Sequence, residues 1–270
     1  MQSEVVSRWS SNTIARAEVL TADMVLELFL GKVAAIIVPR FCSEEVINHA
    51  LKKPNANIIQ EYSNADGVGK VKDCGMAYFE TENKLSLRKE YYAQVLSSTA
   101  EVRNLFQPDP SPVDKIQSIL KTQWSKGTSL LDLGEGPMFV GLIRATKKEI
   151  LPHEDKLERD DPSIVAKVNY MTQASFNCYL SVPKKGGELQ LWDFSLADKR
   201  YDAMRGSSYG IARSLLPPPD ISIQPQQGDL ILFNPRFVHA VSPIEEDTLR
   251  LTASGFILFE GQNKPLSFWS

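Results

Sequence analysis

Two short stretches, Ile150-Leu-Pro-His-Glu-Asp155 and Phe233-Asn-Pro-Arg-Phe-Val-His239, decide how this sequence is interpreted. They contain two of the three histidines of the chain, His153 and His239. His153 and Asp155 are two residues apart, so on an extended strand both would project from the same face. Two histidines and one carboxylate form the facial triad that holds non-haem Fe(II) and leaves coordination positions open. The two stretches therefore predict a metal site made of His153, Asp155 and His239.

A strand with one polar face follows the second stretch. Arg250 and Thr252 alternate with Leu251 and Ala253, which is the period of a β-strand. An arginine that points into the molecule is unfavourable unless it meets an anion. A guanidinium binds a carboxylate through two parallel hydrogen bonds. Arg250 is therefore the predicted anchor for a carboxylate.

This order of residues resembles the Fe(II)/2-oxoglutarate-dependent oxygenases, and residues 186–192 and 227–233 resemble the barrel hairpins of that family. The resemblance implies that His153, Asp155 and His239 bind Fe(II) and that 2-oxoglutarate and O₂ are cosubstrates. It also implies that Arg250, with Thr252, holds the distal carboxylate of 2-oxoglutarate. Asn177 is a further candidate for contact with the cosubstrate; the alternative is an inward polar residue with its own partner.

The order of segments resembles a small-molecule branch of these oxygenases. That branch includes hydroxylases of free or N-acylated amino acids and the carrier-free halogenases of indole alkaloid biosynthesis. In those halogenases a glycine replaces the carboxylate of the triad and opens a site for chloride. Asp155 occupies this position here, which favours hydroxylation over halogenation.

The predicted fold is α+β and mainly β, a double-stranded β-helix (jelly roll, cupin-like) flanked by N-terminal helices. One domain is expected over residues 1–270, with a mostly helical flank over 1–130 and the jelly-roll core over 137–262. Helices are predicted over 22–30 with Thr21 as N-cap, after the N-cap Ser43, over 83–106 and over 113–124. His49 lies on the second helix and is expected at the surface.

One strand is expected over 32–39, and around eight short strands follow residue 137. These are predicted over 138–144, 149–155, 174–182, 188–192, 221–224, 229–233, 238–241 and 250–259. The strand over 188–192 is expected to pair back on 174–182. Residues 1–20 are expected to be a loosely packed lead-in and 55–75 a loop. Residues 195–220 form a long insert, which at the mouth of a barrel would be a substrate lid.

A small-molecule site is predicted at this mouth. Arg144 lies on the strand before His153, and Arg159 and Arg205 lie in two loops that would border the entrance. Several cations at one entrance favour an anionic substrate, such as an amino acid or its N-acyl (for example N-succinyl) derivative. Trp192 is a candidate for an apolar wall. The alternatives are solvated surface charges and a core tryptophan.

Composition excludes several other classes. The net charge of −3 and the pI of about 5.7 give no basic surface for nucleic acid. Three cysteines, an odd number without paired spacing, disfavour a disulfide framework and favour a cytoplasmic location. No stretch approaches the ~20 apolar residues of a membrane span. The sequence is compatible with a homodimer but does not determine the oligomeric state.

The predicted function is Fe(II)- and 2-oxoglutarate-dependent hydroxylation of an aliphatic carbon in a small molecule. Within enzymes, the alternative is an oxygenase that tailors an alkaloid, a peptide or another secondary metabolite, and desaturation or epimerisation would have the same sequence features. Outside enzymes, the alternative is a non-catalytic sensor that binds 2-oxoglutarate. A protein or nucleic-acid demethylase is a third interpretation, and the acidic pI disfavours nucleic acid.

Overall fold

The computed structural model describes residue 9 and residues 13–53, 59–62, 65–71, 74–81, 84–166, 172–245 and 248–270. Their α-helices are α1 (Ala22–Phe29), α2 (Glu44–Leu51), α3 (Leu85–Phe106), α4 (Pro112–Gln123), α5 (Leu157–Asp160) and α6 (Asp198–Arg205). Their strands are β1 (Ile14–Arg16), β2 (Ala35–Val38), β3 (Ile59–Tyr62), β4 (Ala65–Val71), β5 (Thr128–Leu130), β6 (Leu142–Thr146), β7 (Ile150–His153), β8 (Thr172–Ser181), β9 (Leu189–Leu191), β10 (Ile221–Ile223), β11 (Leu230–Phe233), β12 (His239–Val241), β13 (Arg250–Phe259) and β14 (Leu266–Trp269). The fold is therefore mixed α/β.

The N-terminal helices begin where the sequence predicts. The side-chain oxygens of Thr21, Ser43 and Ser111 each accept a hydrogen bond from a backbone N–H group in the first turn of α1, α2 and α4. Such caps satisfy N–H groups that have no partner inside the helix. The helices predicted over 22–30, after Ser43, over 83–106 and over 113–124 are confirmed, and His49 is exposed on α2 as expected.

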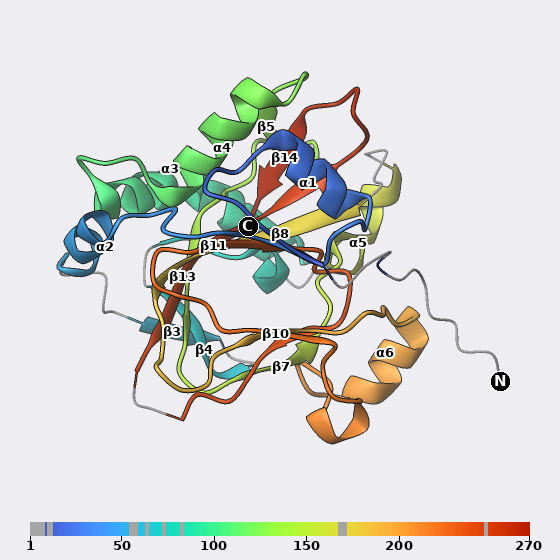
Figure 1. Cartoon of the computed structure of the whole chain (residues 1–270). Helices are drawn as coiled ribbons and strands as arrows, with labels where there is room; N and C mark the ends of the chain where they lie inside the picture. Colours follow the sequence, from blue (N-terminus) through green and yellow to red (C-terminus); the bar gives the residue numbers. More distant parts are fainter. Residues whose placement is uncertain are drawn as a thin grey trace.

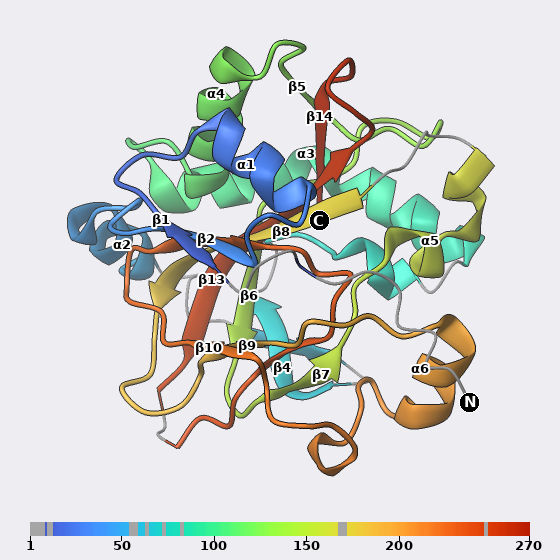
Figure 2. The ribbon, with the colours of Figure 1, turned by 45° about the vertical axis from the view of Figure 1, so that its right-hand side comes forward.

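The strands form two sheets. The larger sheet has the order β1-β2-β11-β8-β13-β6-β4-β3, and β14 pairs with both β13 and β5. The smaller sheet has the order β10-β9-β12-β7. Helices α1 to α4 lie on one side of the larger sheet, and the smaller sheet and α6 lie on the other (Figures 1 and 2). The molecule thus has a helical layer, a large sheet and a small sheet.

Alternation along the strands separates two apolar layers. On β13, Leu251 and Ala253 pack into the main core with α1, α3 and α4. Arg250 and Thr252 therefore project from the opposite face, toward the smaller sheet. A second apolar cluster joins the two sheets and contains Ile37, Tyr179, Leu189, Leu191, Ile221, Ile223 and Ile231. The polar face predicted for β13 thus borders the space between the sheets.

The predicted pairing of residues 188–192 with 174–182 is wrong. β8 pairs with β11 and β13 in the larger sheet, whereas β9 pairs with β10 and β12 in the smaller one. The turn between β8 and β9 therefore carries the chain from one sheet to the other. Gly186 and Gly187 in this turn have φ angles of 75° and 74°. A Cβ on Gly186 would overlap the carbonyl group of Pro243, so this crossing requires glycine.

Residues 59–71 contain a hairpin where the sequence predicts a loop. β3 and β4 pair antiparallel, and β4 also pairs with β6 and so extends the larger sheet. Gly69 lies so close to β3 that a Cβ would overlap the carbonyl oxygen of Gln60. Gly69, which in the sequence suggests a loop, is thus needed for the close approach of β4 to β3. Residues 55–58, 63–64 and 72–73 of the predicted loop lie outside the described residues.

Other boundaries also differ from the predictions. The strand predicted over 138–144 is β6, which begins only after Gly141, a residue with a φ angle of 114°. The insert over 195–220 contains α6 and a 3₁₀ turn, Arg213–Leu215. The predicted lead-in over 1–20 contains β1, and its residues 1–8 and 10–12 lie outside the described residues. β1, β5 and β14 are short strands that the sequence does not reveal.

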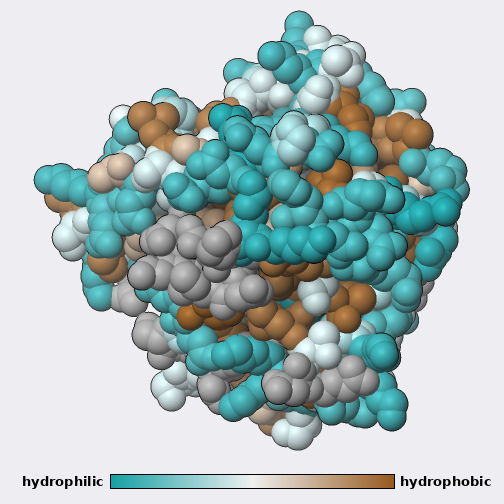
Figure 3. All heavy atoms as spheres, turned by 90° about the vertical axis from the view of Figure 1, so that its left-hand side faces the viewer, coloured by the Kyte–Doolittle hydropathy of each residue, from teal (hydrophilic) through white to brown (hydrophobic). Residues whose placement is uncertain are grey.

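The surface is mostly polar on the face shown in Figure 3. Hydrophilic residues, in teal, cover most of this face, and hydrophobic residues, in brown, gather in separate patches. Among the described residues, no helix is long and apolar enough to cross a membrane.

Candidate metal centre

The two candidate histidine ligands come from neighbouring strands of the smaller sheet. His153 is the last residue of β7, His239 is the first residue of β12, and the two are paired in the register of the sheet. Their ring centroids are 4.1 Å apart, and both side chains are buried. The sheet therefore joins two residues that are far apart in the sequence, as the two stretches predict.

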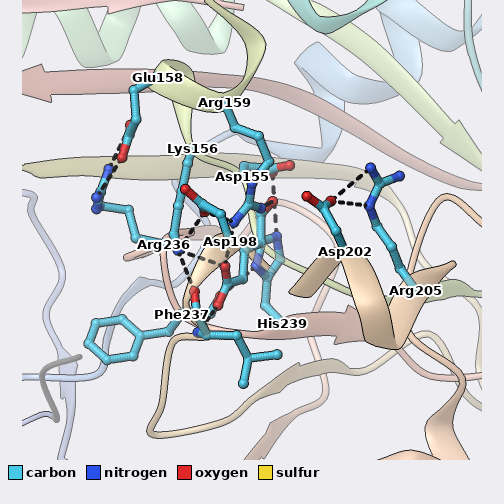
Figure 4. A network of polar contacts seen from close by, with 12 residues as sticks. Asp155, Lys156, Glu158, Arg159, Asp198, Asp202, Arg205, Arg236, Phe237 and His239 are labelled. Atoms are coloured by element: carbon cyan, nitrogen blue, oxygen red, sulfur yellow. Dashed lines mark hydrogen bonds and ion pairs between the residues drawn. The ribbon is translucent and has the colours of Figure 1, made fainter. Parts of the chain in front are cut away.

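Asp155 reaches the same point from the loop after β7. The strand ends at His153, so the carboxylate is not held by strand geometry as predicted. Instead, the backbone N–H of Asp155 donates a hydrogen bond of 2.9 Å to the carbonyl oxygen of Pro235, in the segment before β12. Its Oδ1 is 3.7 Å from His153 Nε2. Its Oδ2 is 3.5 Å from His239 Nε2, and Figure 4 shows these two residues facing each other.

Backbone hydrogen bonds orient both imidazole rings. His153 Nδ1 lies 2.8 Å from the carbonyl oxygen of Leu151, and His239 Nδ1 lies 3.0 Å from that of Phe237. A carbonyl oxygen only accepts, so Nδ1 carries the proton in both rings. Each Nε2 then presents its lone pair to the space beside Asp155. A ring fixed through Nδ1 in this way is the usual arrangement of a histidine that binds a metal.

The protonation states also suit a metal. Burial, together with the nearby charge of His239, lowers the pKa of His153 to about 3, so its ring is neutral near pH 7. Burial alone would raise the pKa of Asp155. The interactions with His153 and His239 outweigh burial and lower this pKa below its ordinary value. The carboxylate is thus ionised beside a neutral ring, as metal ligation requires.

The donor set fits a divalent first-row metal. One ligand atom from each of His153, Asp155 and His239 lies within 4.8 Å of the others. In the part of the chain that the structure describes, this is the one group of three or more His, Cys, Asp or Glu residues that could share an ion. Two imidazoles and a carboxylate are the ligands of non-haem Fe(II) sites with open positions.

A cavity of about 270 Å³ opens at the candidate metal centre and is lined by His153 and Asp155. Its charged lining residues, besides Asp155, are Arg144, Glu154, Lys156, Arg159, Asp160 and Arg205. Aromatic side chains form much of the remaining wall and include Tyr62, Tyr78, Phe79, Tyr201, Tyr209 and Trp269. A concave, largely aromatic site with a few charged groups is typical of small-molecule binding.

Arg250 and Thr252 lie deeper between the sheets, outside this lining. Thr252 is paired with Arg144, which does line the cavity, and Arg250 is the next inward position, about 7 Å further along β13. Arg250 is buried, and its Nη2 donates a hydrogen bond of 3.1 Å to the Tyr179 hydroxyl. Arg250 Nε and Thr252 Oγ1 are buried and have no hydrogen-bond partner among the described residues. Both atoms can donate a hydrogen bond to a carboxylate oxygen, so the chemistry of these residues fits 2-oxoglutarate.

The arginines proposed for the substrate differ in their partners. Arg159 Nη2 lies 2.8 Å from Asp198 Oδ1 and 3.0 Å from a Glu154 oxygen. Arg205 is paired with Asp202 at 2.9 Å. Arg144 forms no ion pair with the described carboxylates, and its buried Nε has no hydrogen-bond partner. Of the three, Arg144 is the one available for an anion.

Two predicted site residues lie away from the cavity. Trp192 is buried in the apolar cluster under the insert, and its Nε1 donates a hydrogen bond of 2.8 Å to the carbonyl oxygen of Pro217. Asn177 donates from Nδ2 to Ser175 Oγ at 3.4 Å on β8. Neither residue lines the cavity. Trp192 thus lies in the core, as its alternative predicts, whereas the contact of Asn177 with the cosubstrate stays a prediction.

Glu154, between the candidate ligands in the sequence, is a positioning residue that the sequence does not reveal. Its buried carboxylate lies 2.8 Å from Lys156 Nζ and 3.0 Å from Arg159 Nη2, and it accepts a hydrogen bond from the backbone N–H of Leu196. Arg159 continues this network to Asp198, the first residue of α6 (Figure 4). The loop that carries Asp155 is therefore tied to the insert.

Asp160, at the end of α5, is a second lining residue without a sequence signal. Burial, reinforced by the negative charge of Asp155, raises the pKa of Asp160 to about 8. Within the described part of the chain, its carboxylate forms no hydrogen bond or ion pair. It is thus a carboxyl group in the cavity without a partner.

Two characterised proteins share part of this sequence. The chain is 25% identical over 149 residues to L-gamma-glutamyl-L-propargylglycine hydroxylase of Streptantibioticus cattleyicolor. It is 29% identical over 120 residues to L-isoleucine 3(1)-dioxygenase of Pantoea ananatis. These matches cover 55% and 40% of this chain and span 55% and 38% of the lengths of the two relatives.

A solved structure and a family model extend over nearly the whole chain. An N-substituted L-amino acid dioxygenase from Burkholderia ambifaria AMMD superposes with a TM-score of 0.68 at 15% identity, over 98% of this chain and 97% of that one. This likeness shows that the two share a fold. The model of the carrier-protein-independent halogenase WelO5 matches residues 13–270. The chain therefore belongs to the WelO5 family, within the Fe(II)/2-oxoglutarate dioxygenase superfamily.

Proposed function

We propose that the chain is an Fe(II)- and 2-oxoglutarate-dependent dioxygenase that hydroxylates an aliphatic carbon of an amino acid or N-acyl amino acid. The observation that carries the proposal is the triad geometry: two free Nε2 atoms and the Asp155 carboxylate meet at one point beside a cavity. Two relatives, an L-gamma-glutamyl-L-propargylglycine hydroxylase and an L-isoleucine dioxygenase, support it. The two sheets are proposed to form a jelly roll within one domain over residues 1–270.

Each part of the site has a role in this proposal. His153, Asp155 and His239 would hold Fe(II), and Arg250 with Thr252 would bind the distal carboxylate of 2-oxoglutarate. Arg144 would bind a carboxylate of the substrate. Once bound, iron and 2-oxoglutarate supply the oxidation: 2-oxoglutarate loses CO₂ and becomes succinate with one atom of O₂, and the other atom enters a C–H bond. The protein itself orients that bond and excludes water through the aromatic wall.

Halogenation is the rival function, because the family model is that of a halogenase. The resembling halogenases have glycine where this chain has Asp155. Here the two carboxylate oxygens lie 3.7 Å and 3.5 Å from the histidine Nε2 atoms. The carboxylate thus occupies the position that a halide would need, which supports hydroxylation. A cytoplasmic location and a homodimer stay predictions.

The proposal can be tested by anaerobic addition of Fe(II) and 2-oxoglutarate, with the weak visible absorption band of the chelate as readout. Amino acids, N-acyl amino acids and other metabolites would then be added with O₂, and succinate and products measured by mass spectrometry. The expected result is the band and a substrate that gains one oxygen atom. Folded protein without the band would refute the metal site, and the band with no turnover of any compound would favour a 2-oxoglutarate sensor.

A further inference from the structure

Most charged side chains that line the cavity already have an opposite charge beside them. Glu154 is paired with both Lys156 and Arg159. Arg205 is paired with Asp202. Within each of these ion pairs the opposite charges largely neutralise each other before any ligand enters. The paired side chains therefore have little charge left to offer a substrate.

Asp160 and Arg144 are the exceptions in the described part of the chain. Neither forms an ion pair there, although both line the cavity. The acids next to Asp160 differ from it, because Glu158 and Asp161 each have an arginine partner outside the cavity lining. Because a partly buried carboxylate without a partner is unfavourable, the protonated form of Asp160 is favoured before a ligand enters. A cation that enters the cavity would stabilise the ionised form.

We propose that Asp160 binds an unacylated ammonium group of the substrate while Arg144 binds a carboxylate. This inference rests on the proposed function and narrows its substrate to free amino acids. Apart from the candidate metal ligand Asp155, the cavity offers one acidic and one basic side chain that form no ion pair within the described part of the chain. Once an ammonium group stabilises the ionised form of Asp160, these two side chains match the two charges of a zwitterion. An N-succinyl amino acid has lost its ammonium group and carries an extra carboxylate, so it would leave Asp160 unsatisfied. The substrate is therefore zwitterionic rather than the predicted anion.

The test compares the specificity of wild-type enzyme and variants for matched pairs of substrates. Each pair is a free L-amino acid and its N-succinyl derivative, and the panel includes L-isoleucine, L-leucine, L-lysine and L-ornithine. The readout is kcat/KM for the free compound divided by kcat/KM for the derivative. Both values come from one protein preparation, so partial loss of folded or iron-loaded enzyme cancels from the ratio.

Asp160→Asn, which keeps the shape and removes the charge, should lower this ratio roughly 100-fold, because a hydrogen bond to a charged group is lost. Glu158→Gln on the same helix is the matched control and should leave the ratio unchanged. An unchanged ratio in Asp160→Asn overturns the inference. Turnover of the N-succinyl compounds alone also overturns it and leaves the proposed function standing, whereas turnover of neither class by wild-type enzyme overturns both.

Discussion

Replacing Arg250 by methionine tests the residue on which the proposed cosubstrate site most depends. Methionine keeps an unbranched side chain and removes the charge and all donors. In the structure the guanidinium is buried, one Nη donates a hydrogen bond to the Tyr179 hydroxyl, and Nε has no hydrogen-bond partner in the described part of the chain. It can therefore give a carboxylate two parallel hydrogen bonds away from water.

The expected loss of affinity follows from these bonds. Each hydrogen bond to a charged group contributes about 1.5–3 kcal/mol, so two contribute at least about 3 kcal/mol. Since 1.4 kcal/mol is a factor of ten, Arg250→Met should raise the Kd for 2-oxoglutarate about 100-fold or more. Arg250→Lys keeps the charge but loses the two parallel donors of the guanidinium. Its Kd for 2-oxoglutarate should therefore lie between those of Arg250→Met and wild type.

The change can be measured by thermal unfolding of metal-loaded protein without O₂. At 100 times the wild-type Kd, 2-oxoglutarate should stabilise wild type by about 2.7 kcal/mol, and a variant with a 100-fold higher Kd by only about 0.4 kcal/mol. Without 2-oxoglutarate, Arg250→Met should be at least as stable as wild type, because an unpaired buried charge is gone. Arg103→Met, at an exposed ion pair on α3, is the control. Equal stabilisation of Arg250→Met and wild type would refute the assignment.

Three further predictions concern the triad and the hairpin. Asp155→Ala should lose iron and turnover, measured as metal per protein and succinate formed; full activity would contradict the ligand assignment. Asp155→Gly with added chloride should give trace chlorinated product by mass spectrometry, and its absence would argue against a preformed halide pocket. Gly69→Ala should destabilise the fold by about 1–3 kcal/mol through its overlap with Gln60, and an unchanged denaturation midpoint would show that β3 can move away.

Local signals made much of the fold predictable. Thr21 and Ser43 mark helix starts because a cap depends on residues within one turn. The alternation around Arg250 predicts β13 because strand periodicity is also local. Residue type and the family resemblance predict that His153 and His239 share one metal site. The structure pairs these two residues on neighbouring strands.

Long-range pairing could not be predicted in the same way. Residues 188–192 have the pattern of a strand, but nothing near them shows which sheet they join. The charges of Arg159 and Arg205 suggested an anion site, and only the fold shows that Asp198 and Asp202 already pair with them. Asp160 lies in a charged segment beside two other acids, Glu158 and Asp161. The sequence does not distinguish these acids, and only the structure shows that Asp160 forms no ion pair within the described part of the chain.

Glu154 bears on how freely the specificity of the proposed enzyme can be engineered. Its carboxylate bonds Lys156, Arg159 and the backbone of Leu196, so the insert is not an interchangeable module. A segment transplanted over residues 195–220 would break contacts that hold the loop of Asp155. The position of this candidate metal ligand would then change. Successful transplants should keep the contacts at Leu196 and Asp198 and change only residues nearer Tyr209, which lines the cavity.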